Sequence, residues 1–173
     1  MGLAQRLRAI TADISGLDVD AIVNAAPETL APGAGVDGAI RRAAGPELTR
    51  ATAVIGGCPT PSAVITPGFR LAARYVVQTA APVYAARPAD DLLLANCYHN
   101  ALARAREYGL EEVAFPALGT GIYGWPAAHA VQIAFTAVVS ALRVYERLVR
   151  VVFCCFRDAD CQRYQALIDG LAA

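Results

Sequence analysis

DAIVNAAPETLAPGAGVDGAIRR, residues Asp20 to Arg42, contains the strongest fold signal in the sequence. It opens with the apolar run Ala21-Ile22-Val23, which predicts a short buried strand. A loop of glycine, alanine and proline follows, and a helix can begin within residues 36–40. Strand, small-residue loop and helix start in this order present backbone N–H groups to an anion. Asp37 lies at the turn into the helix, where a carboxylate can cap N–H groups or face a ligand. An ordinary strand-to-helix connection remains the alternative.

The composition predicts one domain with a substantial core. The chain has 173 residues, of which 56% are hydrophobic and 17% are charged, as expected for strands covered on both faces. The longest weakly polar run, residues 126–142, contains polar side chains and is too short to span a membrane, and the N-terminus shows no signal-peptide pattern. We expect a single cytoplasmic domain over residues 1–173 without a membrane contact. A monomer is our expectation, although the sequence leaves the oligomeric state open.

Charge and cysteine content narrow the classes of partner. The net charge is zero, with 15 basic and 15 acidic side chains and no run of Lys or Arg, so nucleic-acid binding is not indicated. The five cysteines are an odd number in apolar surroundings, which favours reduced thiols in a cytoplasm. There is no CxxC pair and there are only two histidines, so we expect neither a metal site nor a cofactor.

Apolar runs and helix signals alternate along the rest of the chain. The pattern predicts further strands over residues 3–10, 62–66, 75–79, 112–117 and 149–156, and helices over residues 46–55, 90–108, 126–148 and 160–171. Six strands and about five helices in alternation imply an α/β fold. We expect a three-layer α/β/α sandwich around a six-stranded, mixed but mostly parallel sheet.

The helix expected over residues 90–108 has clear boundary signals. Asp90 or Asp91 can cap its start, and Gly109 ends it. Tyr98 and His99 lie outside the stripe of apolar residues at helical spacing, and we interpret His99 as a surface histidine. The residues of that stripe, which we expect to be buried, are Leu93, Cys97, Ala101 and Ala105.

A second glycine-rich stretch, Gly119-Thr120-Gly121-Ile122-Tyr123-Gly124, matches the GxGxxG pattern of dinucleotide-binding folds. That fingerprint also needs an acidic residue about 20 positions later, at the end of the next strand. Residues 138–145 contain none, and Glu146 still falls in the predicted helix. One predicted strand remains after the loop, too few for the usual two halves. A dinucleotide-binding oxidoreductase is therefore a distant alternative.

Several segments together resemble the macrodomain family, in particular its small bacterial, MacroD-like branch. They are VDAIVNAA, GVDGAI and RAAGPEL near the first loop, and GTGIYGWP at the second, where family members carry Ser-Thr-Gly-Val-Tyr-Gly-Tyr-Pro. The resemblance covers nearly the whole chain. It implies the macrodomain fold and ADP-ribose as the ligand, with the diphosphate held between the two small-residue loops. The residues that would line these loops are Gly35, Val36, Gly38, Gly119, Thr120, Gly121 and Ile122.

The resemblance also implies an adenine site. In the family's Gly-Asp-Ile-Thr motif the Asp recognises the adenine amino group, and the segment here, Ala12-Asp13-Ile14-Ser15, keeps Asp and Ile but not Gly. An acceptor carboxylate suits an exocyclic amine, whereas the residues alone favour an Asx turn at Asp13. Phe156 falls where a family aromatic stacks on adenine. Its alternative role is that of the last core residue of a strand.

The site that would act on the distal ribose departs from the family pattern. Family hydrolases use an Asn-Ala-Ala-Asn segment and the aspartate of Gly-Val-Asp to hold the distal ribose and to position the attacking water. Asp37 and the first Asn, Asn24, are present, but the second Asn is Pro27. Proline offers no side-chain hydrogen bond, and the loss of one such buried contact costs roughly 1–3 kcal/mol. Glu28 is adjacent and is a candidate to reach into the site.

Three further positions bear on the site that would act on the distal ribose. Tyr123 would cover the distal ribose, with packing on the core as its alternative role. Arg41 and Gln78 both stand where family members have histidine. We assign Asp37 as the central catalytic residue, supported by Asn24 and Tyr123.

The resemblance implies an enzyme that removes mono-ADP-ribose from acidic side chains of proteins or deacetylates O-acetyl-ADP-ribose. Its partners would be ADP-ribose and ADP-ribosylated proteins. A module that binds ADP-ribose without turnover is the main alternative, because Pro27 replaces an expected Asn.

Overall fold

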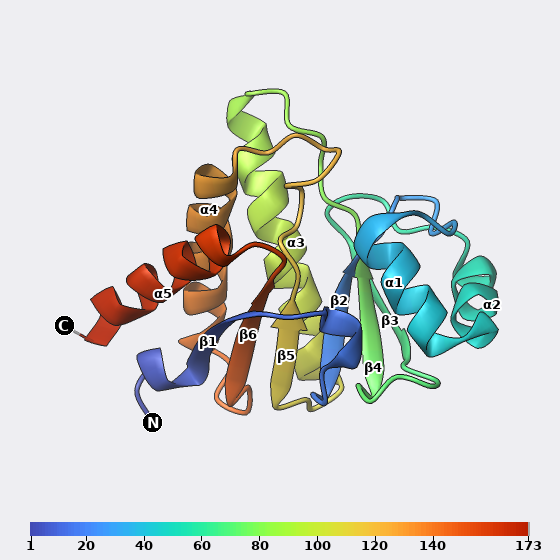
Figure 1. Ribbon diagram of the computed structural model, residues 1–173, viewed down its shortest axis with the longest axis horizontal. Helices are drawn as coiled ribbons and strands as arrows, with labels where there is room; N and C mark the ends of the chain where they lie inside the picture. Colours follow the sequence, from blue (N-terminus) through green and yellow to red (C-terminus); the bar gives the residue numbers. More distant parts are fainter. Residues whose placement is uncertain (173) are drawn as a thin grey trace.

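A single six-stranded sheet organises the computed structural model, which describes residues 1–172 (Figure 1). The strand order is β1-β6-β5-β2-β4-β3, and all neighbours are parallel except the outer pair β3 and β4. The expected mixed, mostly parallel sheet is therefore confirmed. The strands are β1 (Leu7–Thr11), β2 (Ala21–Ala25), β3 (Ala63–Pro67), β4 (Tyr75–Thr79), β5 (Glu112–Phe115) and β6 (Arg150–Cys155).

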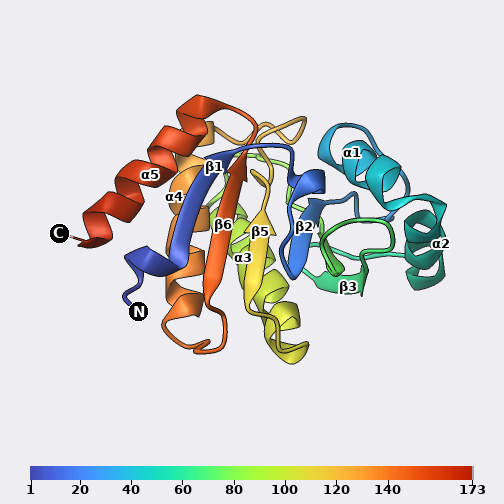
Figure 2. The same cartoon turned by 60° about the horizontal axis from the view of Figure 1, so that its bottom comes forward.

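Helices cover both faces of this sheet, which confirms the three-layer sandwich (Figures 1 and 2). One layer holds α1 (Gly35–Ala44) and α2 (Pro46–Ile55). The other layer holds α3 (Pro88–Glu107), α4 (Ala127–Leu142) and α5 (Asp158–Ala172). Two short 3-10 turns, η1 (Ala4–Arg6) and η2 (Ile14–Gly16), flank β1.

The central strands alternate their side chains between two cores. In β2, Ile22 packs toward α1 and α2, while Ala21 and Val23 pack toward α3 and α4. The neighbouring β4 does the same with Val76 and Val77. Because both faces of these strands are covered, their sequences read as continuous apolar runs rather than as an alternation.

Two element boundaries differ from the sequence-based expectation. The first strand begins at Leu7, because residues 4–6 form η1, and α4 ends at Leu142 rather than near Leu148. The Arg6 guanidinium donates to the carbonyls of Leu142 and Tyr145, both at 2.8 Å, and to that of Leu148. A cation that satisfies the last carbonyls of a helix stabilises its end. Residues 143–148 therefore form a turn that is held by an arginine far away in the sequence.

The helix α3 differs from the expectation at its start and in its buried face. It begins at Pro88, and Asp90 accepts hydrogen bonds from the N–H groups of Ala85 (2.8 Å) and Arg87 (3.2 Å), so its expected role as a cap is confirmed. Leu94 and Tyr98 belong to the buried stripe, whereas Leu93 is only partly buried. The assignment of Tyr98 outside the stripe was wrong, because its ring packs on Phe115 of β5, with ring centroids 4.9 Å apart. The spacing of apolar residues along a helix does not predict which strand a side chain will pack against.

His99 and the cysteines complete the description of the core. His99 is partly buried rather than a surface residue, and desolvation lowers the pKa of its imidazole. The five cysteines are free thiols, and burial raises the pKa of Cys155 to about 12.

Within residues 1–172, no helix combines the length and the apolar character that a membrane crossing requires. The same residues contain no group of three or more His, Cys, Asp or Glu side chains arranged to hold a metal ion.

Candidate functional site

Three loops lie at the carboxyl edge of the sheet. They follow β2, β5 and β6, which lie side by side as β6-β5-β2, and they lead into α1, α4 and α5 (Figure 1). Because the three strands are parallel, their carboxyl ends lie at the same edge, where open α/β sheets bind ligands. The first loop spans residues 26–34, the second residues 116–126, and the third residues 156–157. The residues predicted to bind a ligand are distributed over the second and third loops, the first turn of α1 and the turn after β1.

Asp37 forms the centre of a buried polar cluster at the start of α1. Its side chain is 3% exposed and accepts hydrogen bonds from Asn24 Nδ2 and from the N–H of Gly33, both at 2.6 Å. Arg41 lies one helical turn further on, and its Nε is 3.0 and 3.1 Å from the two carboxylate oxygens. The structure therefore brings together Asn24 and Asp37, which the sequence analysis assigned to one site. It also joins the carboxylate to the first loop through Gly33.

Asn24 reaches a further buried amide on the neighbouring strand. Asn24 of β2 and Gln78 of β4 are paired across the parallel ladder, and Asn24 Nδ2 donates to Gln78 Oε1 at 2.7 Å. Both side chains are fully buried. Asn24 Oδ1 and Gln78 Nε2 have no hydrogen-bond partner within the described part of the chain. Such atoms cost free energy, and in native proteins they require an explanation such as a functional role.

Arg41, to which the sequence assigned no role, belongs to the same buried cluster. Its guanidinium is buried and donates to the Thr49 and Thr52 hydroxyls, each at 3.1 Å, and to the Leu30 carbonyl at 2.9 Å. A signal was present in the sequence, because Asp37 and Arg41 are four residues apart on a predicted helix and therefore share a face. Glu28 does not reach into this cluster. It is exposed, and its carboxylate accepts from the N–H of Thr60 at 2.8 Å.

The first loop has a tight backbone geometry. Gly35 begins α1 with φ +60°, a conformation that side chains rarely adopt. A Cβ at Gly38 would lie 3.1 Å from the Gly33 carbonyl oxygen, so the loop folds closely over the first turn of the helix. Gly33 and Gly35 are exposed and Val36 is partly buried. The loop therefore offers accessible backbone next to a helix N-terminus.

The second loop is fixed by Trp125. The indole Nε1 donates to the Pro82 carbonyl at 2.8 Å, and the Trp125 N–H donates to the Gly119 carbonyl at 3.1 Å. Gly119 has φ +82°, and a Cβ there would lie 2.5 Å from Trp125 Cδ1. Gly121 and Ile122 are exposed, with Ile122 at 97%, and the Thr120 hydroxyl donates to the Ala117 carbonyl. Trp125 thus fixes the base of the second loop, and the tip of that loop, at Gly121 and Ile122, is exposed.

Tyr123 lies between the loop tip and the core. Its ring is partly buried and packs against the core on the α3–α4 side, which is the alternative role foreseen for it. Its carbonyl accepts a hydrogen bond from the Tyr84 N–H at 2.9 Å. The packing leaves part of the ring accessible, so a contact with a ligand stays a prediction.

Asp13 and Phe156 follow the ends of two adjacent strands. Thr11 of β1 and Cys155 of β6 are paired in register, so both residues lie near the same corner of the sheet. Asp13 Oδ1 accepts from the N–H of Ser15 at 2.9 Å and from its hydroxyl at 2.7 Å. These hydrogen bonds lower the pKa of Asp13, because they favour the charged form. The Asx turn is therefore formed, and the exposed carboxylate can still accept from a ligand.

Phe156 is not a core residue, because β6 ends at Cys155 and the Phe156 side chain is 91% exposed. The alternative role considered for it was therefore wrong. Ile14, which follows Asp13 in the turn after β1, is buried at 3% exposure and packs in the α1–α2 core. An exposed aromatic ring and an exposed carboxylate at one corner of the sheet are suited to a flat heterocycle with an amino group.

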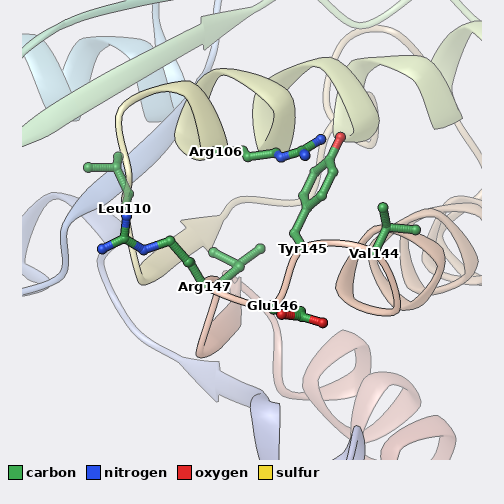
Figure 3. A pocket seen from close by; sticks show the side chains of 7 residues that line it. Arg106, Leu110, Val144, Tyr145, Glu146 and Arg147 are labelled. Atoms are coloured by element: carbon green, nitrogen blue, oxygen red, sulfur yellow. The ribbon is translucent and has the colours of Figure 1, made fainter.

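A separate hollow of about 300 Å³ lies away from this site (Figure 3). It is lined by the end of α3 and by the turn after α4, and Arg106 stacks over the Tyr145 ring at 4.8 Å. None of the residues predicted to bind a ligand lines it. The parallel strands β5 and β6 begin at this edge, opposite the edge that carries the three loops.

Comparison with known proteins identifies the family. The family model described as Macro domain matches residues 23–134, which include both small-residue loops. The chain belongs to the Macro domain family. A macro domain-containing protein of Chlorobaculum tepidum is 48% identical over 160 residues, 92% of this chain and 93% of the relative. This macrodomain is also 41% identical to an O-acetyl-ADP-ribose deacetylase of Salmonella newport, over 96% of both chains.

Other relatives and solved structures agree with this assignment. An ADP-ribose glycohydrolase of Xenopus laevis is 40% identical over 94% of this macrodomain and 40% of the longer relative. The structure of an Oceanobacillus iheyensis macrodomain with ADP superposes with a TM-score of 0.88 at 36% identity, covering 96% of this chain and 91% of that one. A Trypanosoma brucei macrodomain in complex with ADP-ribose gives 0.89 at 35% identity, covering 94% and 69%. The alternative of a dinucleotide-binding oxidoreductase was based on the GxGxxG match and is set aside by this family membership.

Proposed function

We propose that this macrodomain binds ADP-ribose at the carboxyl edge of its sheet. The adenine would lie at Asp13, beside Ile14, and stack on Phe156, and the distal ribose would lie near Asp37 and Tyr123. The observation that carries the proposal is the location of three loops at one edge of the sheet, where they follow the adjacent parallel strands β6, β5 and β2. The diphosphate would lie against the backbone of two of them, at Gly35, Val36, Gly38, Gly119, Thr120, Gly121 and Ile122.

The chemistry of the loops supports a diphosphate ligand. Exposed glycines at the N-terminus of α1 and at the second loop tip allow close approach of phosphate oxygens to backbone N–H groups. The chain as a whole carries no net charge, so backbone donors and the helix dipole, rather than a basic patch, would provide the attraction. This is consistent with the solved macrodomains that hold ADP and ADP-ribose.

We further propose that the bound nucleotide is a substrate, because relatives about 40% identical are named as an ADP-ribose glycohydrolase and an O-acetyl-ADP-ribose deacetylase. In glycohydrolysis, a water oxygen bonds to the anomeric carbon, the bond from that carbon to the protein carboxylate breaks, and a proton is released. In deacetylation, the water oxygen bonds to the acetyl carbonyl carbon, the bond from that carbon to the ribose oxygen breaks, the ribose oxygen takes up a proton, and acetate and a second proton are released. Asp37 would orient the distal ribose and the water, with Asn24 holding the carboxylate and Tyr123 covering the sugar.

A module that binds without turnover is the second candidate, and two observations favour it. Pro27 removes one side-chain hydrogen bond that the family's hydrolases use. In addition, both oxygens of Asp37 already accept from protein donors, namely Asn24, Gly33 and Arg41, which limits the room for a water molecule.

A turnover assay separates the two candidates. The protein is incubated with a mono-ADP-ribosylated acidic protein and, separately, with O-acetyl-ADP-ribose, and the release of ADP-ribose or acetate is followed over time. Release well above that of a buffer blank supports the enzyme. Binding of ADP-ribose without release from either substrate supports the module.

Phe156→Ala tests the adenine end of the proposed site. The side chain is 91% exposed, so its removal should leave the free energy of unfolding unchanged within about 0.5 kcal/mol. Loss of one base-aromatic stack costs about 1–3 kcal/mol, so we expect ADP-ribose binding in calorimetry to be about 5- to 150-fold weaker. Val144→Ala, which removes an exposed side chain from the opposite edge, is the control. Equal affinity of Phe156→Ala and the wild type would contradict stacking at this position.

A further inference from the structure

The cluster around Asp37 is held from two opposite ends by residues that the proposed function does not use. Arg41 lies at one end and Gln78 at the other, and Asp37 and Asn24 connect them. The chain of contacts runs from β4 through β2 into α1 and on to α2. Its four side chains are buried, with none above 8% exposure.

At the first end, Arg41 joins three parts of the fold through one planar group. Its Nε binds Asp37 in α1, its Nη1 binds Thr49 and Thr52 in α2, and its Nη2 binds the carbonyl of Leu30 in the first loop. The rigid fork of a guanidinium can make these contacts together, whereas a lysine ammonium is a point donor on a flexible stem. Arg41 therefore fixes both the orientation of Asp37 and the path of the first loop.

At the second end, Gln78 fixes the orientation of the Asn24 amide. Gln78 Oε1 accepts from Asn24 Nδ2, and the same nitrogen donates to Asp37 Oδ1. Because Asn24 has no exposed surface, it acts on Asp37 rather than on a ligand.

In the series of hydrogen bonds from Gln78 to Arg41, the chemistry of the side chains determines which atom donates and which accepts. Arginine can only donate, so Asp37 must accept from it, and the Asn24 NH₂ group must donate to Asp37. The remaining bond of the carboxylate goes to the Gly33 N–H at 2.6 Å, so the same network holds the loop next to the proposed distal ribose. A carboxylate held by donors on three sides cannot rotate without breaking a buried hydrogen bond.

We propose that Arg41 and Gln78 are positioning residues that clamp Asp37 from two sides and thereby set the carboxylate and the Gly33 loop for the distal ribose. The proposal rests on the proposed function, because it assumes that the distal ribose of ADP-ribose lies next to Asp37.

The experiment compares the affinities of two ligands by calorimetry. ADP-ribose carries the distal ribose, and ADP has the adenosine and the diphosphate but lacks that sugar. Arg41→Lys keeps the positive charge and loses the fork. We expect Arg41→Lys to weaken ADP-ribose binding about tenfold and ADP binding less than twofold. Arg50→Lys makes the same change at an exposed position of α2, and it should leave both affinities unchanged.

Gln78→Met tests the Gln78 end of the hydrogen-bond network. It also keeps the proposal testable if Arg41→Lys fails to fold. Methionine has a similar length but offers no strong acceptor to Asn24. It should produce the same selective loss for ADP-ribose, with a circular dichroism spectrum like that of the wild type. An equal loss for both ligands in the folded variants would indicate a structural role alone, and unchanged ADP-ribose affinity in both variants would also overturn the proposal. A wild type that binds neither ligand would instead refute the proposed function, and the clamp with it.

Discussion

Replacing Asp37 with alanine should both abolish turnover and strongly destabilise the protein. The substitution leaves the buried Arg41 guanidinium without its counter-charge, and it removes the acceptor for Asn24 and for the Gly33 N–H. Breaking a buried ion pair by removing one partner typically costs about 3–5 kcal/mol. Because domains of this kind are stable by only about 5–15 kcal/mol, we expect a large shift of the urea midpoint at unchanged slope.

Two further variants separate the structural from the catalytic effect of Asp37. Asp37→Asn keeps the shape and one acceptor oxygen but lacks the charge, so it should unfold at a midpoint between those of Asp37→Ala and the wild type, still without turnover. Asp18→Ala removes an exposed carboxylate from the opposite edge of the sheet and should change neither quantity. A midpoint of Asp37→Ala equal to that of the wild type would show that the Arg41 ion pair contributes nothing to stability. Wild-type turnover in Asp37→Asn would remove Asp37 from the proposed mechanism.

Gly119→Ala should destabilise the second loop and weaken ligand binding. The new Cβ would lie 2.5 Å from Trp125 Cδ1, and the residue would keep a backbone with φ +82°. Trp125 cannot move aside easily, because its Nε1 is bound to Pro82 and its ring packs on Tyr84 with centroids 4.9 Å apart. Strained backbone costs about 1–2 kcal/mol, and overpacking costs typically 1–3 kcal/mol. We expect the free energy of unfolding to fall by about 2–4 kcal/mol and ADP-ribose affinity to fall at least tenfold.

Gly121→Ala is the matched control for the stability measurement. Gly121 belongs to the same loop, but a Cβ there would meet no atom within 4 Å, and its φ is not in the left-handed region. Its urea midpoint should equal that of the wild type. If Gly119→Ala and Gly121→Ala were equally stable, the contact with Trp125 would not be what fixes the loop.

The strands and their order along the chain could be predicted because their causes are local. The apolar runs of β2 and β6 and the break at Gly109 appear where expected, since buried parallel strands and left-handed helix ends have their own residue patterns. The wrong predictions concern positions whose structure depends on a side chain far away in the sequence. Arg6 ends α4 through carbonyls more than a hundred residues away, and Tyr98 is buried by a strand that follows it.

In the candidate site, too, some features could be predicted from the sequence and others could not. Asn24 and Asp37 could be grouped from a resemblance in sequence, and the structure brings them to 2.6 Å. The network that orients them could not be predicted, because Gln78 meets Asn24 only through the pairing of β2 with β4, and Arg41 meets Thr49 and Thr52 only through the packing of α1 on α2. Hydrogen bonds between elements depend on their packing, which no local pattern encodes.

The most direct test of the account is a calorimetric titration of the purified protein with ADP-ribose, alongside Asp13→Ala. Asp13 is exposed, so its removal should leave the fold intact while taking away the acceptor for the adenine amino group. We predict binding in the micromolar range, about −8 kcal/mol, that is clearly weaker in the variant. The absence of detectable binding to the folded wild-type protein would contradict the account.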